Sequence, residues 1–227
     1  LDALGAPADV PQCEFWAKGH GFKTAYSVIE ASSIAHTMGR PVVAAESFTS
    51  APGEDWRLHP GAMKAQTDWA LCAGINRIIF HTFQHQPWLD RWPGMAMGPY
   101  GVHWQRTQTW WEMSGAYHRY IARCQHMLRQ GDPVADVLYL AAEGAPHVFR
   151  PPPSALAGDD VMPDRRGYNF DGCDPSVLAT RAEVRGDGRI VLRRPPGESG
   201  CDSPAYRVLV LPDCETMTPG LLARVKA

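Results

Sequence analysis

The sequence lacks several features that would place it in a particular class of protein. No apolar run approaches the roughly 18 residues of a membrane-spanning helix, and no basic run exceeds two residues. The formal net charge is only −2, which offers little attraction to nucleic acid or to an anionic membrane. The six cysteines form no CxxC pair and no regular spacing, which argues against a disulfide framework and a zinc site. We therefore expect neither nucleic acid nor a membrane as a partner.

The two ends of the sequence also lack the usual boundaries of a protein. The chain begins at Leu1 without a methionine, a basic start or an apolar signal core. It ends at Ala227 inside a helical pattern. We interpret the chain as an internal fragment of a longer protein, with any targeting signal outside it. Its hydrophobic fraction of 44% and charged fraction of 20% are ordinary for a globular protein.

The most informative stretch begins with Val-Val-Ala-Ala at residues 42–45, which predicts a buried strand of a parallel sheet. Glu46 follows where this strand should end, and a polar loop comes next. Barrel enzymes place their chemistry at the carboxyl ends of their strands. Glu46 is therefore the first catalytic candidate, and pairing with Arg57 or Arg77 is the structural alternative.

A second strand is predicted at residues 75–80, and residues 60–74 between the two strands have the apolar spacing of a helix. Strand, helix and strand in this order form the repeating unit of a parallel α/β fold. The segment after the second strand carries side chains that could hydrogen-bond or stack on a sugar: His81, Gln84, His85 and Trp88. The two histidines could instead bind a metal ion together with Glu46, or have a structural role.

Glycoside cleavage needs two carboxyl groups, one protonated and one ionised. Glu14, in a Cys-Glu-Phe-Trp segment, is the second catalytic candidate, and a loop glutamate beside an incidental tryptophan is the alternative. Tryptophans in loops are harder to explain as core than tryptophans in helices, and their flat faces suit a pyranose ring. Trp56 and Trp88 are the candidates for stacking on a sugar, and Trp92 and Trp104 have similar positions.

The composition changes after Gly131, which predicts a boundary near residue 132. Before it, residues 24–38 and 105–130 are predicted helices. After it, strands are predicted at 135–140 and 206–212, with a hairpin around Asp187-Gly188. Asp171 and Asp174 match a calcium-binding loop only loosely, and we interpret their segment as a structural turn.

The motifs taken together resemble those of glycoside hydrolase family 106, the α-L-rhamnosidases. The resemblance covers nearly the whole chain in order. It rests on EFW (14–16), AHTMGR (35–40), AESFT (45–49), GINR (74–77), HTFQHQPW (81–88), PGM (93–95), RTQTWW (106–111), GYNFD (167–171) and VLVLP (208–212).

The resemblance implies that residues 1–132 are the C-terminal portion of a (β/α)8 TIM-like barrel and that residues 133–227 begin a flavodoxin-like α/β domain. It implies inverting hydrolysis of terminal α-L-rhamnose from plant-type glycans or glycosides. It also implies a calcium ion near the sugar, with ligands not identified, and a secreted or periplasmic location. Because the barrel of this family begins before Leu1, we expect at least one catalytic glutamate upstream and no activity from this fragment alone.

Other functions are compatible with the same residues. A retaining β-galactosidase-like glycosidase would hold its carboxyl groups about 5–5.5 Å apart, whereas an inverting enzyme holds them about 6.5–9.5 Å apart. A non-catalytic carbohydrate-binding scaffold could share the fold, since fold does not determine function. A metal hydrolase using His81 and His85 is a further alternative.

Overall fold

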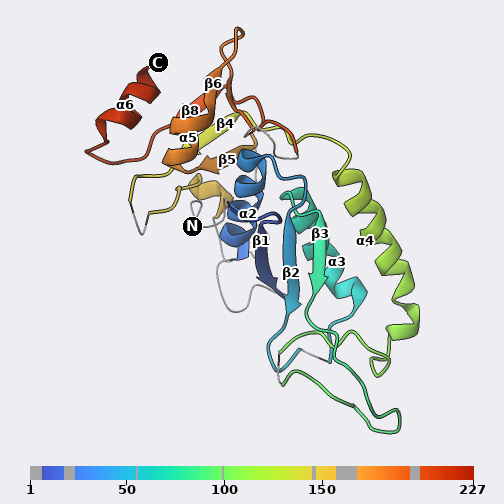
Figure 1. The fold of residues 1–227 in the computed structure, drawn as a ribbon. Helices are drawn as coiled ribbons and strands as arrows, with labels where there is room; N and C mark the ends of the chain where they lie inside the picture. Colours follow the sequence, from blue (N-terminus) through green and yellow to red (C-terminus); the bar gives the residue numbers. More distant parts are fainter. Residues whose placement is uncertain are drawn as a thin grey trace.

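The computed structural model describes residues 7–17, 24–54, 56–98, 100–144, 147–156, 168–194 and 200–227. They form two three-stranded parallel sheets and a small antiparallel hairpin (Figure 1). The elements are β1 (Gln12–Trp16), α2 (Thr24–Met38), β2 (Ala44–Thr49), α3 (Pro60–Cys72), β3 (Arg77–Phe80), η2 (Trp111–Met113), α4 (Gly115–Leu128), β4 (Val137–Leu140), η3 (Pro153–Ala155), β5 (Phe170–Cys173), α5 (Pro175–Arg181), β6 (Ala182–Val184), β7 (Ile190–Leu192), β8 (Val208–Val210) and α6 (Pro219–Lys226). The expected α/β class with parallel strands is confirmed.

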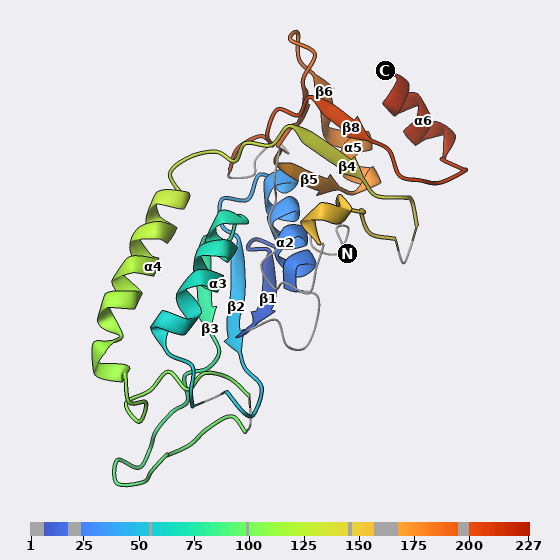
Figure 2. The ribbon, with the colours of Figure 1, turned by 180° about the vertical axis from the view of Figure 1, so that it is seen from behind.

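The first sheet has the order β1-β2-β3, with α2 and α3 as the crossover connections. Its helices gather on one side of the sheet, as the two opposite views show (Figures 1 and 2). Phe15, Ala45 and Phe80 point to that side and pack in one core with residues of α2, α3 and α4. Because side chains alternate along a strand, Glu14 and Glu46 leave the opposite face, which none of these three helices covers.

The second sheet has the order β5-β4-β8, so its first strand in sequence lies in the centre. The segment interpreted as a turn around Asp171 is in fact the buried strand β5, and that interpretation was wrong. Gly172 is required there, because a Cβ would lie 2.1 Å from the ring of Phe149. Asp174 caps the N-terminus of α5 by accepting a hydrogen bond from the Ser176 amide at 2.8 Å, which is a structural role.

Helix α2 joins the two sheets. Val28, Ala31 and Ala35 pack in the core of the first sheet, whereas Ile29 packs with Phe149 and Phe170 beside the second. A polar contact adds to this packing. Asp171 of β5 is buried and lies 2.8 Å from Nδ1 of His36 on α2, and the Tyr206 hydroxyl donates to its other oxygen at 3.0 Å.

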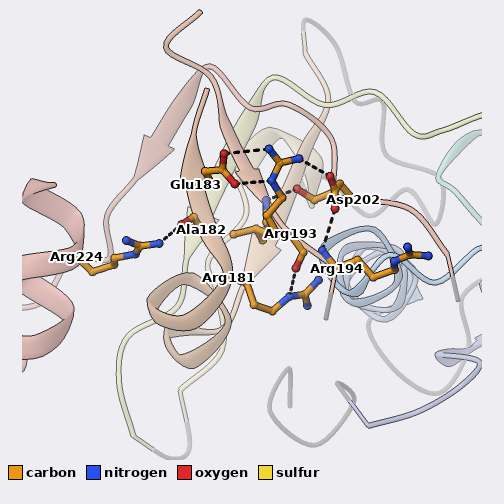
Figure 3. Close-up of polar contacts among 9 residues, drawn as sticks. Arg181, Ala182, Glu183, Arg193, Arg194, Asp202 and Arg224 are labelled. Atoms are coloured by element: carbon orange, nitrogen blue, oxygen red, sulfur yellow. Dashed lines mark hydrogen bonds and ion pairs between the residues drawn. The ribbon is translucent and has the colours of Figure 1, made fainter. Parts of the chain in front are cut away.

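The hairpin β6–β7 forms around Asp187-Gly188, as predicted, and a charged cluster covers it (Figure 3). The Arg193 guanidinium donates to both carboxyl oxygens of Glu183, at 2.6 and 3.0 Å, and to Asp202 at 2.6 Å. These contacts hold the pKa of Glu183 below its ordinary value. The Arg194 amide and the Arg193 guanidinium do the same for the pKa of Asp202.

One expectation about a helix was also wrong. The predicted helix 105–130 is helical only in α4 and, as a short 3-10 turn, in η2. The segment before η2 forms successive tight turns, with hydrogen bonds from Gln108 N to Gln105 O and from Trp111 N to Gln108 O. Cys72 is exposed and Cys124 is half-buried, and all six cysteines are free. Among the described residues, no helix is long and apolar enough to cross a bilayer.

Gly39 ends α2 and should be one of the least replaceable residues of the fold. Its amide donates to His36 O and that of Arg40 to Ala35 O, which forms a Schellman motif with Gly39 at φ 67°. A Cβ on Gly39 would lie 2.0 Å from the carbonyl oxygen of Cys201. We therefore expect Gly39→Ala to lower the free energy of unfolding by about 3 kcal/mol, measured by denaturant titration.

Gly188→Ala is the matched control, because Gly188 also has a positive φ, 79°, but a Cβ there would have no atom within 4 Å of it. We expect it to cost only about 1 kcal/mol, the conformational part alone. Equal losses of unfolding free energy in the two variants would show that the backbone at Cys201 moves away from the new Cβ without a loss of stability.

Candidate active site

Two glutamates lie side by side on the uncovered face of the first sheet. Glu14 of β1 and Glu46 of β2 are direct partners in the register of the two parallel strands. Neighbouring strands are about 4.8 Å apart, so the two side chains leave the same face next to each other. Both residues are partly exposed. The structure thus brings together the two carboxylates that the sequence singled out separately.

Each carboxylate is held by a different neighbour. The Trp16 indole N–H donates to Oε1 of Glu14. Oε1 of Glu46 accepts a hydrogen bond from the Thr49 hydroxyl at 3.3 Å and lies 3.9 Å from Nε2 of His81, which follows β3. The strands β1 and β2 and the segment directly after β3 therefore all contribute polar side chains to this site.

The sequence predicted that the strand ends at Glu46, but β2 continues to Thr49. The register shifts after the pair Phe15–Ser47, and Phe48 is the extra residue, buried and with φ 68°. This bulge turns Thr49 to the face that carries Glu46, which a regular strand would not allow. A phenylalanine with positive φ costs about 1–3 kcal/mol and such strain gathers at functional sites. Thr49 is a site residue that the sequence analysis missed.

The loop after β3 returns to the site through residues 100–104. Thr82 N donates to Val102 O at 3.1 Å and Val102 N to His81 O at 3.0 Å. This pairing places the Tyr100 ring 5.8 Å from the Trp16 ring, beside Glu14. Gly101 allows the approach, because a Cβ there would lie 2.6 Å from Nδ1 of His81. Neither Tyr100 nor Gly101 stood out in the sequence.

The other predicted sugar contacts lie further along the same loops. Gln84, His85 and Trp88 belong to the segment that extends beyond the strand ends (Figures 1 and 2). The Trp88 ring is 53% exposed, with the Arg91 guanidinium 5.8 Å from its centre. Exposed aromatic surface of this kind is available for stacking, but these side chains are not gathered around Glu46 by any described contact.

Two tryptophans have different surroundings from those expected. Trp56 is 37% exposed and tilts over the ring of His103 with 4.2 Å between centres. Trp104 is buried, packed against Phe80 and Trp110. Trp104 lies in a loop, as expected, but it is a core residue because this loop folds back onto the helix-covered face of the sheet.

Gln86 and Gln105 stabilise the long loop after β3, a role that the sequence analysis did not predict. Gln86 accepts from the Met95 amide at 2.9 Å and donates to the Met95 carbonyl at 2.6 Å, and its amide also contacts the Gln105 side chain. Gln105 in turn donates to Pro93 O at 3.3 Å. These bonds hold the loop in shape in place of regular secondary structure.

Cys13 lies next to Glu14 but is no candidate nucleophile. It is buried on the opposite face, and burial raises the pKa of its thiol to about 12. The reactive form of cysteine is the thiolate. Cys13 therefore stays protonated at neutral pH and serves as a small core residue.

A calcium ion takes six to eight oxygen ligands. Glu14, Glu46 and Thr49 offer oxygens of the required kind, but the described ranges contain no group of three or more histidine, cysteine, aspartate or glutamate side chains that could hold a metal. These residues do not form a calcium site by themselves. The same finding argues against a metal centre made by His81, His85 and Glu46.

Comparisons with known proteins identify the family to which the chain is similar. The sequence profile of glycoside hydrolase family 106, described as alpha-L-rhamnosidase, matches residues 3–227. A protein of Formosa agariphila named "Putative beta-glucuronidase" is 36% identical over 223 residues, which cover 98% of this chain and 17% of that protein. A rhamnosidase structure from Novosphingobium sp. PP1Y has a TM-score of 0.79 and 28% identity, covering 99% of this chain and 20% of that one.

The chain therefore spans a fifth or less of the length of these relatives. The profile match extends over both sheets, from before β1 to the end of α6. The chain is a member of glycoside hydrolase family 106, the family of the α-L-rhamnosidases.

Proposed function

We propose that the whole protein hydrolyses terminal α-L-rhamnosyl residues of plant-type glycans or glycosides, with Glu46 and Glu14 as catalytic carboxylates. The observation that carries the proposal is the placement of these two side chains in register on the uncovered face of a parallel sheet. In a closed (β/α)8 barrel this face would be the interior, and the strand ends would line the site. The family resemblance further suggests that residues 133–227 begin a flavodoxin-like domain. It also suggests that the protein is secreted or periplasmic.

Hydrolysis with inversion needs an acid that protonates the glycosidic oxygen and a base that activates water. Glu46 and Glu14 would divide these roles, with a carboxylate from outside this chain as a further member. His81 and Thr49 would hold Glu46 in position. Gln84, His85, Trp88 and Trp56 would contact sugar hydroxyls and ring faces as the substrate settles over the strand ends.

The test is release of L-rhamnose from an aryl α-L-rhamnoside by the whole protein, with calcium and with a chelator. Proton NMR during the first minutes shows the anomer formed, and we expect β-L-rhamnose from the inverting reaction. The α-anomer as first product would establish the retaining alternative. Loss of activity with the chelator, restored by calcium, would support a calcium ion near the sugar.

A second substrate is suggested by the name of the Formosa agariphila relative, "Putative beta-glucuronidase". An aryl β-D-glucuronide is therefore assayed beside the rhamnoside. Turnover of the glucuronide alone would contradict the rhamnoside proposal while leaving the carboxylate chemistry in place. Sugar binding without turnover of either substrate would support a non-catalytic scaffold.

Thr49 offers a sharper test of the site. Thr49→Val keeps the shape of the side chain but removes the hydroxyl that donates to Glu46. Since a hydrogen bond to a charged group contributes about 1.5 kcal/mol or more, we expect kcat for the rhamnoside to fall about tenfold. Thr49→Ser keeps the hydroxyl and should keep most of the activity. Equal kcat values for the two variants would show that the hydroxyl is irrelevant.

A further inference from the structure

A cavity of about 580 Å³ lies at the carboxyl edge of the second sheet. Tyr139 and Leu140 line it from β4, and Glu143 and Arg150 line it from the loop after β4. Pro212 and Thr216 close it from the loop that follows β8. Its volume falls in the range of small-molecule sites in proteins, about 300–1,000 Å³.

The position of the cavity in the topology is informative. β4 is the central strand, the chain passes to β5 on one side of it, and it reaches β8 on the other side. The loops that leave the ends of β4 and β8 therefore diverge, and the cavity lies between them. Open α/β sheets bind their ligands at this switch point, outside the carboxyl ends of the strands.

The usual ligand at such a place is a phosphate bound by a helix N-terminus. Here that position is occupied by the protein itself. Glu143 accepts hydrogen bonds from the Thr218 amide at 2.8 Å and from the Thr218 hydroxyl at 2.7 Å, at the start of α6. Asp213 adds a second carboxylate to the lining. An anion at the start of α6 would be repelled by these two groups.

The remaining lining favours a neutral ligand with many hydroxyl groups. Arg150 and His147 can donate hydrogen bonds, Asp213 can accept them, and Thr216 can do both. Leu140, Pro212 and the body of Tyr139 supply apolar surface. A sugar presents the same combination of hydroxyl groups that donate and accept and of apolar C–H faces.

We propose that this cavity binds a neutral mono- or disaccharide, on the sheet that does not carry Glu14 and Glu46. The proposal does not depend on hydrolysis by those two glutamates. A bound sugar would contact Arg150 and Asp213 through its hydroxyls and Tyr139 through its ring. The site would hold the protein on a carbohydrate substrate or retain a released product.

The test uses the whole protein carrying Glu46→Gln, so that turnover does not interfere. L-rhamnose and rhamnose-containing disaccharides are titrated in separate calorimetric and ligand-detected NMR experiments. Ala142 lines the cavity, and Ala142→Trp would fill it. Ala179 lies exposed on α5, so Ala179→Trp is the matched control. Thermal unfolding confirms that both variants are folded.

We expect two sugar-binding events. One weakens at least tenfold in Ala142→Trp and is unchanged in Ala179→Trp, and the other, at the Glu46 site, is unchanged in both variants. Hydrolysis by the otherwise unaltered protein should be the same with either tryptophan, which separates this site from the one at Glu46. The absence of any binding event that Ala142→Trp weakens would overturn the proposal. Binding of inorganic phosphate or flavin mononucleotide, lost in Ala142→Trp, would also overturn it.

Discussion

Glu46→Gln should lower kcat for an aryl α-L-rhamnoside about 10³-fold in the whole protein while leaving the fold intact. The substitution keeps the size of the side chain and its contact with Thr49, but it removes the ability to exchange a proton. General acid–base catalysis contributes about 10²–10⁴-fold, which sets the expected loss. Initial rates and thermal unfolding of the same samples measure the effect.

Glu112→Gln is the matched control, because Glu112 is exposed on η2 and the substitution makes the same chemical change away from the site. It should leave kcat unchanged. Turnover by Glu46→Gln within a few-fold of the unaltered protein would move the chemistry to carboxylates outside this chain.

Glu14→Gln separates the roles of the two carboxylates. An acid that protonates the leaving group matters less when the leaving group is already good, whereas a base that activates water matters for every substrate. Measuring kcat of Glu14→Gln and Glu46→Gln on an aryl rhamnoside and on a rhamnosyl disaccharide therefore distinguishes the acid from the base. The variant that loses activity mainly on the disaccharide identifies the acid. The variant that loses activity on both substrates identifies the base.

The second large effect concerns stability. Asp171→Ala should lower the free energy of unfolding by about 3 kcal/mol, because it removes the buried carboxylate that hydrogen-bonds to His36 and Tyr206. Burial and the neighbouring Asp171 raise the pKa of Tyr206 well above its ordinary value, and its hydroxyl would remain buried without its acceptor. Chemical denaturation followed by tryptophan fluorescence measures the loss.

Asp174→Ala is the comparison for that prediction. Asp174 caps α5 at its N-terminus, and losing such a cap costs about 1 kcal/mol. A loss for Asp171→Ala no larger than this would mean that the contact between α2 and β5 depends on apolar packing alone.

The sequence was sufficient to predict the elements with strong local patterns. Helix α2 spans residues 24–38 as its apolar spacing predicted, and the hairpin forms around Asp187-Gly188 as predicted. β5 was missed because its four residues include a glycine and an aspartate, both rare in strands. Tertiary contacts with Phe149, His36 and Tyr206 account for those two residues, and local patterns contain no information about them.

The candidate site could be predicted only in part for a related reason. Glu46 could be recognised at the end of a predicted strand and Glu14 beside a tryptophan, but their direct pairing depends on the register between β1 and β2. Thr49 reaches Glu46 only through the bulge at Phe48, where an aromatic residue adopts a conformation that favours glycine. No propensity rule predicts that conformation.

Helix α2 limits how the protein can be divided in the laboratory. A cut near residue 132, where composition changes, would leave the first sheet with a helix whose Ile29 and Met38 had lost their partners in the second region. Newly exposed apolar surface promotes association. An excised catalytic module would therefore need polar substitutions at these two positions to be handled as a monomer. Evolution would face the same difficulty in shuffling the two regions separately, so we expect them to be inherited as one unit.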